Sequence, residues 1–233
     1  MIKNILAIIM VLSLSACAAT KEDKAKLAAV HKVAVYSAMG TSMNYDYIGT
    51  TIFSNKVADR DVTDWNLDGY AEQSMVAALA RKGYQAHTLQ GANFARQTDV
   101  EPSDVQNLIA LARTEQDDAL VVIETGDIPS EHKNLLPFRR GYGMTQKSFM
   151  GLSNIFLYTL VYVTTYDVAS GKALAGSDGY SIWTGAPSSE VLKDWEWQET
   201  PGTYTPEQMT TLETKTKALL DKPLAYAVTD MGL

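Results

Sequence analysis

The residues from Asp64 to Gly69 form the sharpest chemical motif in this 233-residue chain. Side chains that carry oxygen occupy every second position, at Asp64, Asn66 and Asp68, and glycine follows. This spacing lets alternate side chains wrap one hard cation, as in the first half of a calcium-binding loop. The second half does not match, because Met75 stands where calcium needs a bidentate carboxylate. We therefore favour the alternative, a helix N-terminus at which these side chains cap free backbone amides.

Other catalytic and metal-binding chemistries have no matching pattern. His31, His87 and His132 are far apart, and none has a second ligand at zinc-binding spacing. Ser153 follows Gly151 but lacks the second glycine of a nucleophile elbow. We expect no catalytic residue, no metal and no cofactor, so the protein is predicted not to be an enzyme.

Cys17 is the single cysteine of the chain and closes a short apolar stretch. Lys3 supplies a positive start, residues 5–14 supply an apolar core, and small residues precede the cysteine. The sequence Leu14-Ser15-Ala16-Cys17 resembles the lipobox of bacterial lipoproteins. In that family the signal peptidase cuts before the cysteine, which then receives a diacylglycerol and a further acyl chain. The resemblance implies a signal peptide at residues 1–16 and lipidation at Cys17.

The same resemblance implies a location. The apolar run ends by Ala19 and is too short for a transmembrane helix, whereas two or more acyl chains anchor a protein stably. In lipoproteins an aspartate after the lipidated cysteine favours the inner membrane, and Ala18 stands at that position here. We therefore expect the protein to be held by Cys17 at the outer membrane, facing the periplasm.

Composition and charge narrow the function further. Hydrophobic residues make up 46% of the chain and charged residues 20%, which is typical of a globular protein. The formal net charge is −7, and removal of Lys3 with the signal peptide would make the mature chain more acidic. Such a balance argues against nucleic-acid binding and against electrostatic attachment to anionic lipid. A chain whose single cysteine is lipidated forms no disulfide.

Hydrophobic periodicity and turn residues predict the secondary structure. Helices are expected at residues 67–82, at 103–114 and from Thr205-Pro206-Glu207 onward. Strands are expected at 32–37, 48–53, 84–89, 119–123 and 156–166, and a turn at 167–172 leads to a hairpin partner at 173–183. Residues 17–30 should form the lipidated N-terminus and a tether, residues 39–47 a loop, and residues 31–233 a single periplasmic α/β domain. Its sheet should be mixed, flanked by helices, with a late antiparallel hairpin.

This order of elements resembles the small periplasmic α/β domains of envelope-assembly lipoproteins. Examples are the activators of peptidoglycan synthases, the curli-secretion lipoprotein and the amino-terminal domain of the Tol-system translocation protein. The resemblance covers residues 32–220 and rests on element order without a shared functional motif, so it implies a fold rather than an activity.

Residues 126–153 interrupt the regular pattern and gather positive charge and aromatic groups on an acidic protein. We expect Phe138, Arg139, Arg140 and Tyr142 to bind a partner, because arginine and aromatic residues dominate interface hot spots. Basic and aromatic residues near them are Lys133, Lys147 and Phe149. The alternative is a solvated loop whose aromatic side chains fold back on the domain.

The sequence as a whole predicts a non-catalytic envelope lipoprotein that binds a protein partner or assists envelope assembly. Its expected contacts are the lipid bilayer, through acylated Cys17, and an envelope protein, but no nucleic acid. The alternative function is a periplasmic module that binds a small ligand or a glycan.

Overall fold

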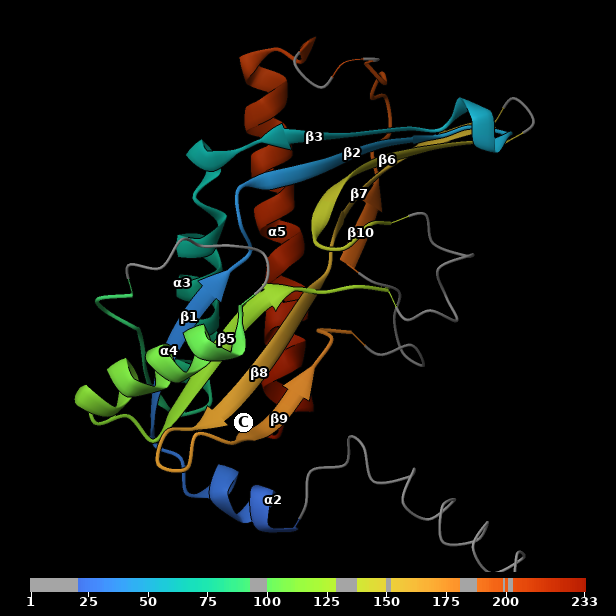
Figure 1. Ribbon diagram of the computed structural model, residues 1–233. Helices are drawn as coiled ribbons and strands as arrows, with labels where there is room; N and C mark the ends of the chain where they lie inside the picture. The colour runs from blue at the N-terminus through green and yellow to red at the C-terminus, as the bar shows by residue number, and fades with distance from the viewer. Residues whose placement is uncertain are drawn as a thin grey trace, which may run out of the picture.

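Two five-stranded sheets form the framework of the computed structural model, which describes residues 21–92, 100–128, 138–149, 152–180, 188–198, 200 and 203–233 (Figure 1). Sheet A has the order β4 (Gln85–Thr88), β1 (Lys32–Ala38), β5 (Ala119–Thr125), β8 (Val161–Asp167) and β9 (Ala173–Ser177). Sheet B has the order β10 (Ser188–Val191), β7 (Leu152–Thr159), β6 (Tyr142–Phe149), β2 (Ser42–Ile48) and β3 (Lys56–Asp61). Both sheets are mixed, which confirms the α/β class, but the sequence predicted only one sheet.

Helices cover both faces of sheet A. Alternate residues of β1 enter two separate apolar clusters, since side chains of a strand point to opposite faces. Val33 and Val35 pack with α3 (Leu67–Arg81) and α5 (Pro206–Asp230), whereas Ala34 and Tyr36 pack with α4 (Pro102–Thr114). The remaining helical elements are α2 (Lys21–Ala28), η1 (Ile52–Ser54) and η2 (Thr63–Trp65). Among the described residues, no helix has both the length and the apolar character needed to span a membrane.

The predictions for sheet A and its helices are largely confirmed. The continuous apolar run at 119–123 is the buried β5, and the turn at 167–172 joins β8 to β9 as an antiparallel hairpin. Helix α5 begins as predicted at Pro206, where Thr205 and Gln208 form a capping box. It continues to Asp230, although Pro223 lies inside it.

The single strand predicted at 156–166 is wrong, because the chain changes sheets within it. Residue Leu160 separates β7 of sheet B from β8 of sheet A. Three backbone hydrogen bonds close this crossing: Gly126 N–H to the Leu160 carbonyl (2.9 Å), Gly141 N–H to the Gly126 carbonyl (2.9 Å), and Leu160 N–H to the Gly141 carbonyl (2.7 Å). A Cβ atom at Gly126 would lie 2.5 Å from the Val161 carbonyl oxygen, so only glycine fits there.

The sequence also missed most of sheet B. The loop predicted at 39–47 and the strand at 48–53 are both wrong: β2 occupies 42–48, and the following residues form the turn with η1. The segment 126–153 is not irregular throughout, because it contains β6 and the start of β7. The polar residues Asn44 and Asp46 have low strand propensity but lie buried in β2, because Asn44 bonds to the Tyr158 hydroxyl and Asp46 to Arg139.

The N-terminal tether predicted at 17–30 is helical over residues 21–28. Leu27 and the following Val30 are buried in the main apolar cluster, so α2 belongs to the domain. Cys17 and the signal peptide lie outside the described residues.

The motif from Asp64 to Asp68 connects α3 to β1. The helix N-terminus expected there is confirmed, since α3 begins at Leu67, but the expected capping by Asn66 is wrong. Asn66 has a left-handed backbone (φ 45°) and makes no capping bond through its side chain. The buried Asp68 carboxylate accepts hydrogen bonds from Met39 N–H (2.6 Å) and from Ser37 Oγ (2.8 Å). Asp64 is exposed, so the alternating oxygen groups do not face one point as a calcium loop requires.

We predict that Asp68→Ala lowers the free energy of unfolding by about 3 kcal/mol, because it leaves two buried donors without an acceptor. The measurement is urea denaturation followed by circular dichroism, with Asp64→Ala as the control on the same turn. The control should unfold at the wild-type urea concentration. Equal urea midpoints for the wild type and both variants would show that Asp68 does not stabilise the connection from β1 of sheet A to β2 of sheet B.

Candidate functional site

The aromatic members of the predicted partner-binding set point into the domain. Phe138 is buried and stacks on Tyr158, with ring centroids 4.4 Å apart and planes 11° from parallel. Tyr142 is buried too, and its hydroxyl donates a hydrogen bond to the Gly40 carbonyl (3.0 Å). The side chains of Phe138 and Tyr142 therefore fold back on the domain, as in the alternative to partner binding. Lys133 lies outside the described residues.

Arg139 ties two strands of sheet B together. Its Nε donates to Asp46 Oδ2 (2.7 Å), and its second guanidinium nitrogen donates to the Ala58 carbonyl (2.8 Å) and to Asp59 Oδ1 (2.7 Å). Burial raises the pKa of Asp46 above its ordinary value, although Arg139 opposes the shift. Burial alone would lower the pKa of Arg139, but the bonds to Asp46 and Asp59 raise it overall. Arg139 thus stays charged and holds β2 to β3.

Arg140 is exposed, and its Nε donates to the Thr125 carbonyl (3.0 Å). It lies with Arg139 at a surface groove of about 520 Å³, here called the arginine groove. This groove is also lined by Asn44, Asp46, Tyr47 and Val57, among others. The structure therefore brings the two predicted arginines together at one opening, with an apolar strand residue beside them.

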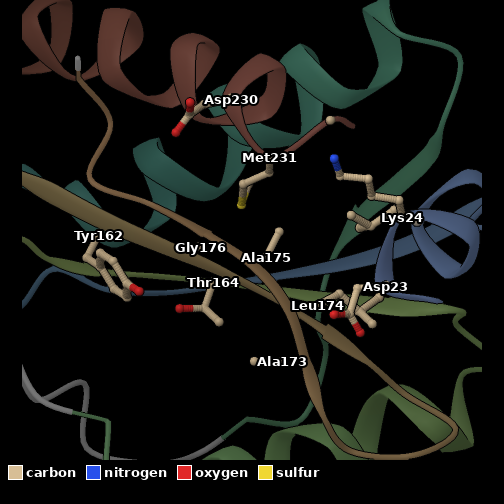
Figure 2. A pocket seen from close by; sticks show the side chains of 12 residues that line it. Asp23, Lys24, Tyr162, Thr164, Ala173, Leu174, Ala175, Gly176, Asp230 and Met231 are labelled. Atoms are coloured by element: carbon tan, nitrogen blue, oxygen red, sulfur yellow. The ribbon is translucent and has the colours of Figure 1, made fainter. Parts of the chain in front are cut away.

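A second hollow, here called the anchor groove, lies beside α2 (Figure 2). It has a volume of about 780 Å³, and helix α2, strands β8 and β9 and the end of α5 line it. Its polar side chains include Asp23, Lys24, Tyr162, Thr164 and Asp230. Acidic, basic and neutral groups are mixed along this wall, a distribution that selects no single ligand charge.

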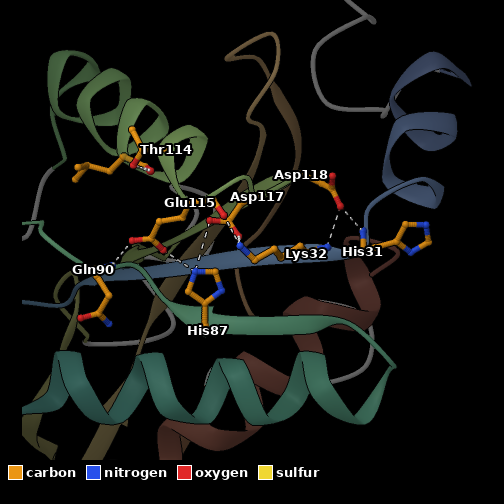
Figure 3. A network of polar contacts seen from close by, with 9 residues as sticks. His31, Lys32, His87, Gln90, Thr114, Glu115, Asp117 and Asp118 are labelled. Atoms are coloured by element: carbon orange, nitrogen blue, oxygen red, sulfur yellow. Dashed lines mark hydrogen bonds and ion pairs between the residues drawn. The ribbon is translucent and has the colours of Figure 1, made fainter.

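The third arrangement is a cluster of charged side chains at the edge of sheet A, here called the histidine cluster: His87, Glu115, Asp117 and Lys32 (Figure 3). His87 Nε2 lies 2.7 Å from Glu115 Oε2 and 3.5 Å from Asp117 Oδ2. Lys32 Nζ lies 3.3 Å from Asp117 Oδ1 and also donates to the Glu115 carbonyl. The cluster exists because β4, which carries His87, pairs with β1, which carries Lys32.

The end of α4 fixes the two carboxylates of this cluster. Asp117 N–H bonds to the Ala112 carbonyl (3.1 Å) and Gln116 N–H to the Arg113 carbonyl (3.2 Å). This pair of bonds, with Gln116 in the left-handed region (φ 60°), is a Schellman motif. Burial raises the pKa of Asp117 above its ordinary value, whereas the neighbouring His87 and Lys32 act in the opposite direction.

Spacing in the sequence did not reveal this cluster, because Lys32, His87 and Glu115 lie far apart along the chain. His31 lies directly before β1, and its ring points away from the cluster (Figure 3). The Schellman motif was also not predicted, because Gln116 occupies the left-handed position at which glycine usually marks the end of a helix.

Comparison with known proteins adds no identity, since no protein-family profile and no curated protein matches the chain. Functional inference therefore rests on the motif at Cys17 and on the three surface features described above.

We predict that Arg139→Ala lowers the free energy of unfolding by about 2 kcal/mol at pH 7, because it leaves the buried Asp46 carboxylate without its cation. Arg140→Ala, which removes an exposed arginine of the same groove, is the matched control and should change stability by less than about 0.5 kcal/mol. Thermal unfolding of the three proteins measures the difference.

The deficit should depend on pH. A raised pKa in the folded state means that charged Asp46 costs stability above that pKa and that the cost disappears once the carboxyl is protonated. Removing Arg139 increases this cost, so the deficit should be largest near neutral pH and should shrink as the pH falls towards about 4. A deficit that stays constant with pH would contradict this account of Arg139.

Proposed function

We propose that the protein is a lipoprotein of the bacterial outer membrane that binds an envelope protein partner and catalyses no reaction. The observation that carries the proposal is the lipobox Leu14-Ser15-Ala16-Cys17, which stands directly before the folded domain. Acylation of Cys17 would hold the domain on the periplasmic face of the membrane.

The short distance between Cys17 and α2 supports a defined orientation. Helix α2 begins at Lys21, four residues after Cys17, and an extended chain of that length spans at most about 14 Å. The end of the domain that carries α2 would therefore face the bilayer. Sheet B reaches out at the opposite end of the molecule, so its strands would point away from the membrane (Figure 1).

Apolar side chains at the outer end of sheet B favour contact with a protein. Phe53 in η1 is 93% exposed, and Val57 on the edge strand β3 is 67% exposed. Exposed large apolar groups near an arginine are typical of binding surfaces, because aromatic and arginine side chains contribute most to interface energy. Val57 and Arg140 line the arginine groove, whereas Phe53 lies outside its lining, in η1 before β3. These three residues are here called the arm surface.

A second candidate function is the binding of a small ligand or a glycan. The anchor groove favours it, because a volume of about 780 Å³ lies within the usual range for small-molecule sites. Its mixed polar lining would suit a neutral, hydroxyl-rich ligand better than a charged one.

We predict that Cys17 is acylated and becomes the first residue of the mature protein. Cells that express the wild type or Cys17→Ser would be labelled with a clickable palmitate, and the protein would be recovered and probed for label. The wild type should carry label and remain with outer membranes, whereas Cys17→Ser should carry none. Equal labelling of both proteins would remove the basis of the lipoprotein proposal.

We predict that Phe53→Ser and Val57→Ser each lower the yield of a crosslinked partner from intact envelopes by about fivefold, which corresponds to about 1 kcal/mol of binding energy. Val191→Ser is the matched control, since Val191 is an exposed valine on β10, the other edge strand of sheet B. Melting curves would verify that all variants fold. Equal recovery from the three variants and the wild type would exclude the arm surface as the partner contact.

A further inference from the structure

The histidine cluster offers three metal-binding atoms from residues that are distant in the sequence. One imidazole nitrogen of His87 and one carboxylate oxygen each of Glu115 and Asp117 all lie within 4.8 Å of one another. A mixed nitrogen and oxygen set of this kind suits Zn²⁺ and similar divalent transition metals, whereas Ca²⁺ and Mg²⁺ prefer oxygen ligands alone.

The separations within the cluster are close to those that a bound metal requires. Ligand atoms about 2.0–2.1 Å from a tetrahedral Zn²⁺ lie roughly 3.4 Å apart. The nitrogen of His87 is 2.7 Å from the Glu115 oxygen and 3.5 Å from the Asp117 oxygen. The His87 and Asp117 atoms thus already have a suitable separation, and the His87 and Glu115 atoms would need to move apart by roughly 0.7 Å.

Asp117 gives an independent indication that a cation belongs here. Its side chain is 0% exposed, and the charged groups near its carboxylate oxygens are Lys32 Nζ at 3.3 Å and His87 Nε2 at 3.5 Å, neither in good hydrogen-bond geometry. Buried carboxylates are normally satisfied by hydrogen bonds. The contacts of Asp117 are instead with the cationic Lys32 and with His87, so both oxygens face the interior of the cluster (Figure 3).

The backbone positions of Glu115 and Asp117 are fixed at a place that favours a cation. The Schellman motif fixes both residues at the end of α4, and the carbonyl groups at a helix C-terminus attract positive charge. Little conformational freedom would therefore be lost when a metal binds.

Lys32 occupies the cluster as its resident cation. One ammonium group offsets only one of the two carboxylates, so the cluster keeps a net negative charge when His87 is neutral. A metal would displace Lys32 Nζ from Asp117, while the Glu115 carbonyl remains available to it. His87 and Glu115 are each partly exposed, which leaves a path from solvent and a free coordination position for water.

We propose that His87, Glu115 and Asp117 form a binding site for one divalent transition metal, best matched by Zn²⁺, and that Lys32 competes with the metal for Asp117. The site is independent of the lipid anchor and of the arm surface. Its place at the edge of sheet A ties β4 to the end of α4, so the bound metal would stabilise the fold.

The experiment titrates Zn²⁺ into the purified full chain in detergent, against a chromogenic chelator and by calorimetry. The wild type should bind one equivalent with a micromolar dissociation constant, and His87→Gln should weaken binding at least tenfold. Lys32→Met, which removes the competing ammonium, should strengthen binding about fivefold. His31→Gln, which changes a histidine outside the cluster and next to Lys32, should bind Zn²⁺ as the wild type does.

Co²⁺ absorption provides a second measurement that does not depend on stability. Co²⁺ bound by this donor set should give visible bands, and these should disappear in His87→Gln while circular dichroism shows a native fold. Absence of Zn²⁺ binding by both the wild type and Lys32→Met would overturn the proposal and leave the cluster as an ion-pair network. Binding that persists in His87→Gln would overturn it as well, because the metal would then lie elsewhere.

Discussion

The structure depends on two of the places where the chain passes from one sheet to the other. At the first, between β1 and β2, the buried carboxylates of Asp68 and Glu72 accept hydrogen bonds from the end of β1. At the second, between β7 and β8, backbone groups of Gly126, Gly141 and Leu160 bond directly to one another. The hydroxyl of Tyr142, which donates to the Gly40 carbonyl, links the two crossings. The first crossing is held by buried carboxylates and the second by direct backbone hydrogen bonds. Together these contacts fix how the two sheets are placed relative to each other.

The surface features follow from these crossings. Arg139 and Arg140 immediately precede Gly141, so the second crossing determines where both guanidinium groups lie. The histidine cluster follows from the order of sheet A, in which β1 lies between β4 and β5. The arginine groove and the histidine cluster therefore rest on different parts of the same framework, and a change at one need not alter the other.

The sequence predicts the parts of the fold whose signals are local. Continuous apolar runs gave β1 and β5, and helical spacing gave α3 and α4, because burial on sheet A demands those patterns. Sheet B gave no such signal, since β2 and β6 contain Asn44, Asp46 and Gly143 at positions that tertiary contacts require. The break at Leu160 was invisible because apolar alternation continues through it. The sequence predicted Arg139 and Arg140 as site residues because they are neighbours in one segment. It did not predict the histidine cluster, because His87 and Asp117 come together only through strand pairing.

The continuity of the strands has a mechanical consequence. Strands β2 and β7 of sheet B continue, through the crossings, into β1 and β8, and both of these are interior strands of sheet A. A pull on the outer end of sheet B would be carried along the backbone into the middle of sheet A. There the load would act along the strands and stretch many hydrogen bonds in parallel, rather than peel an edge strand away one bond at a time. Tension applied to the outer end of sheet B would thus reach the strands of sheet A directly through the backbone.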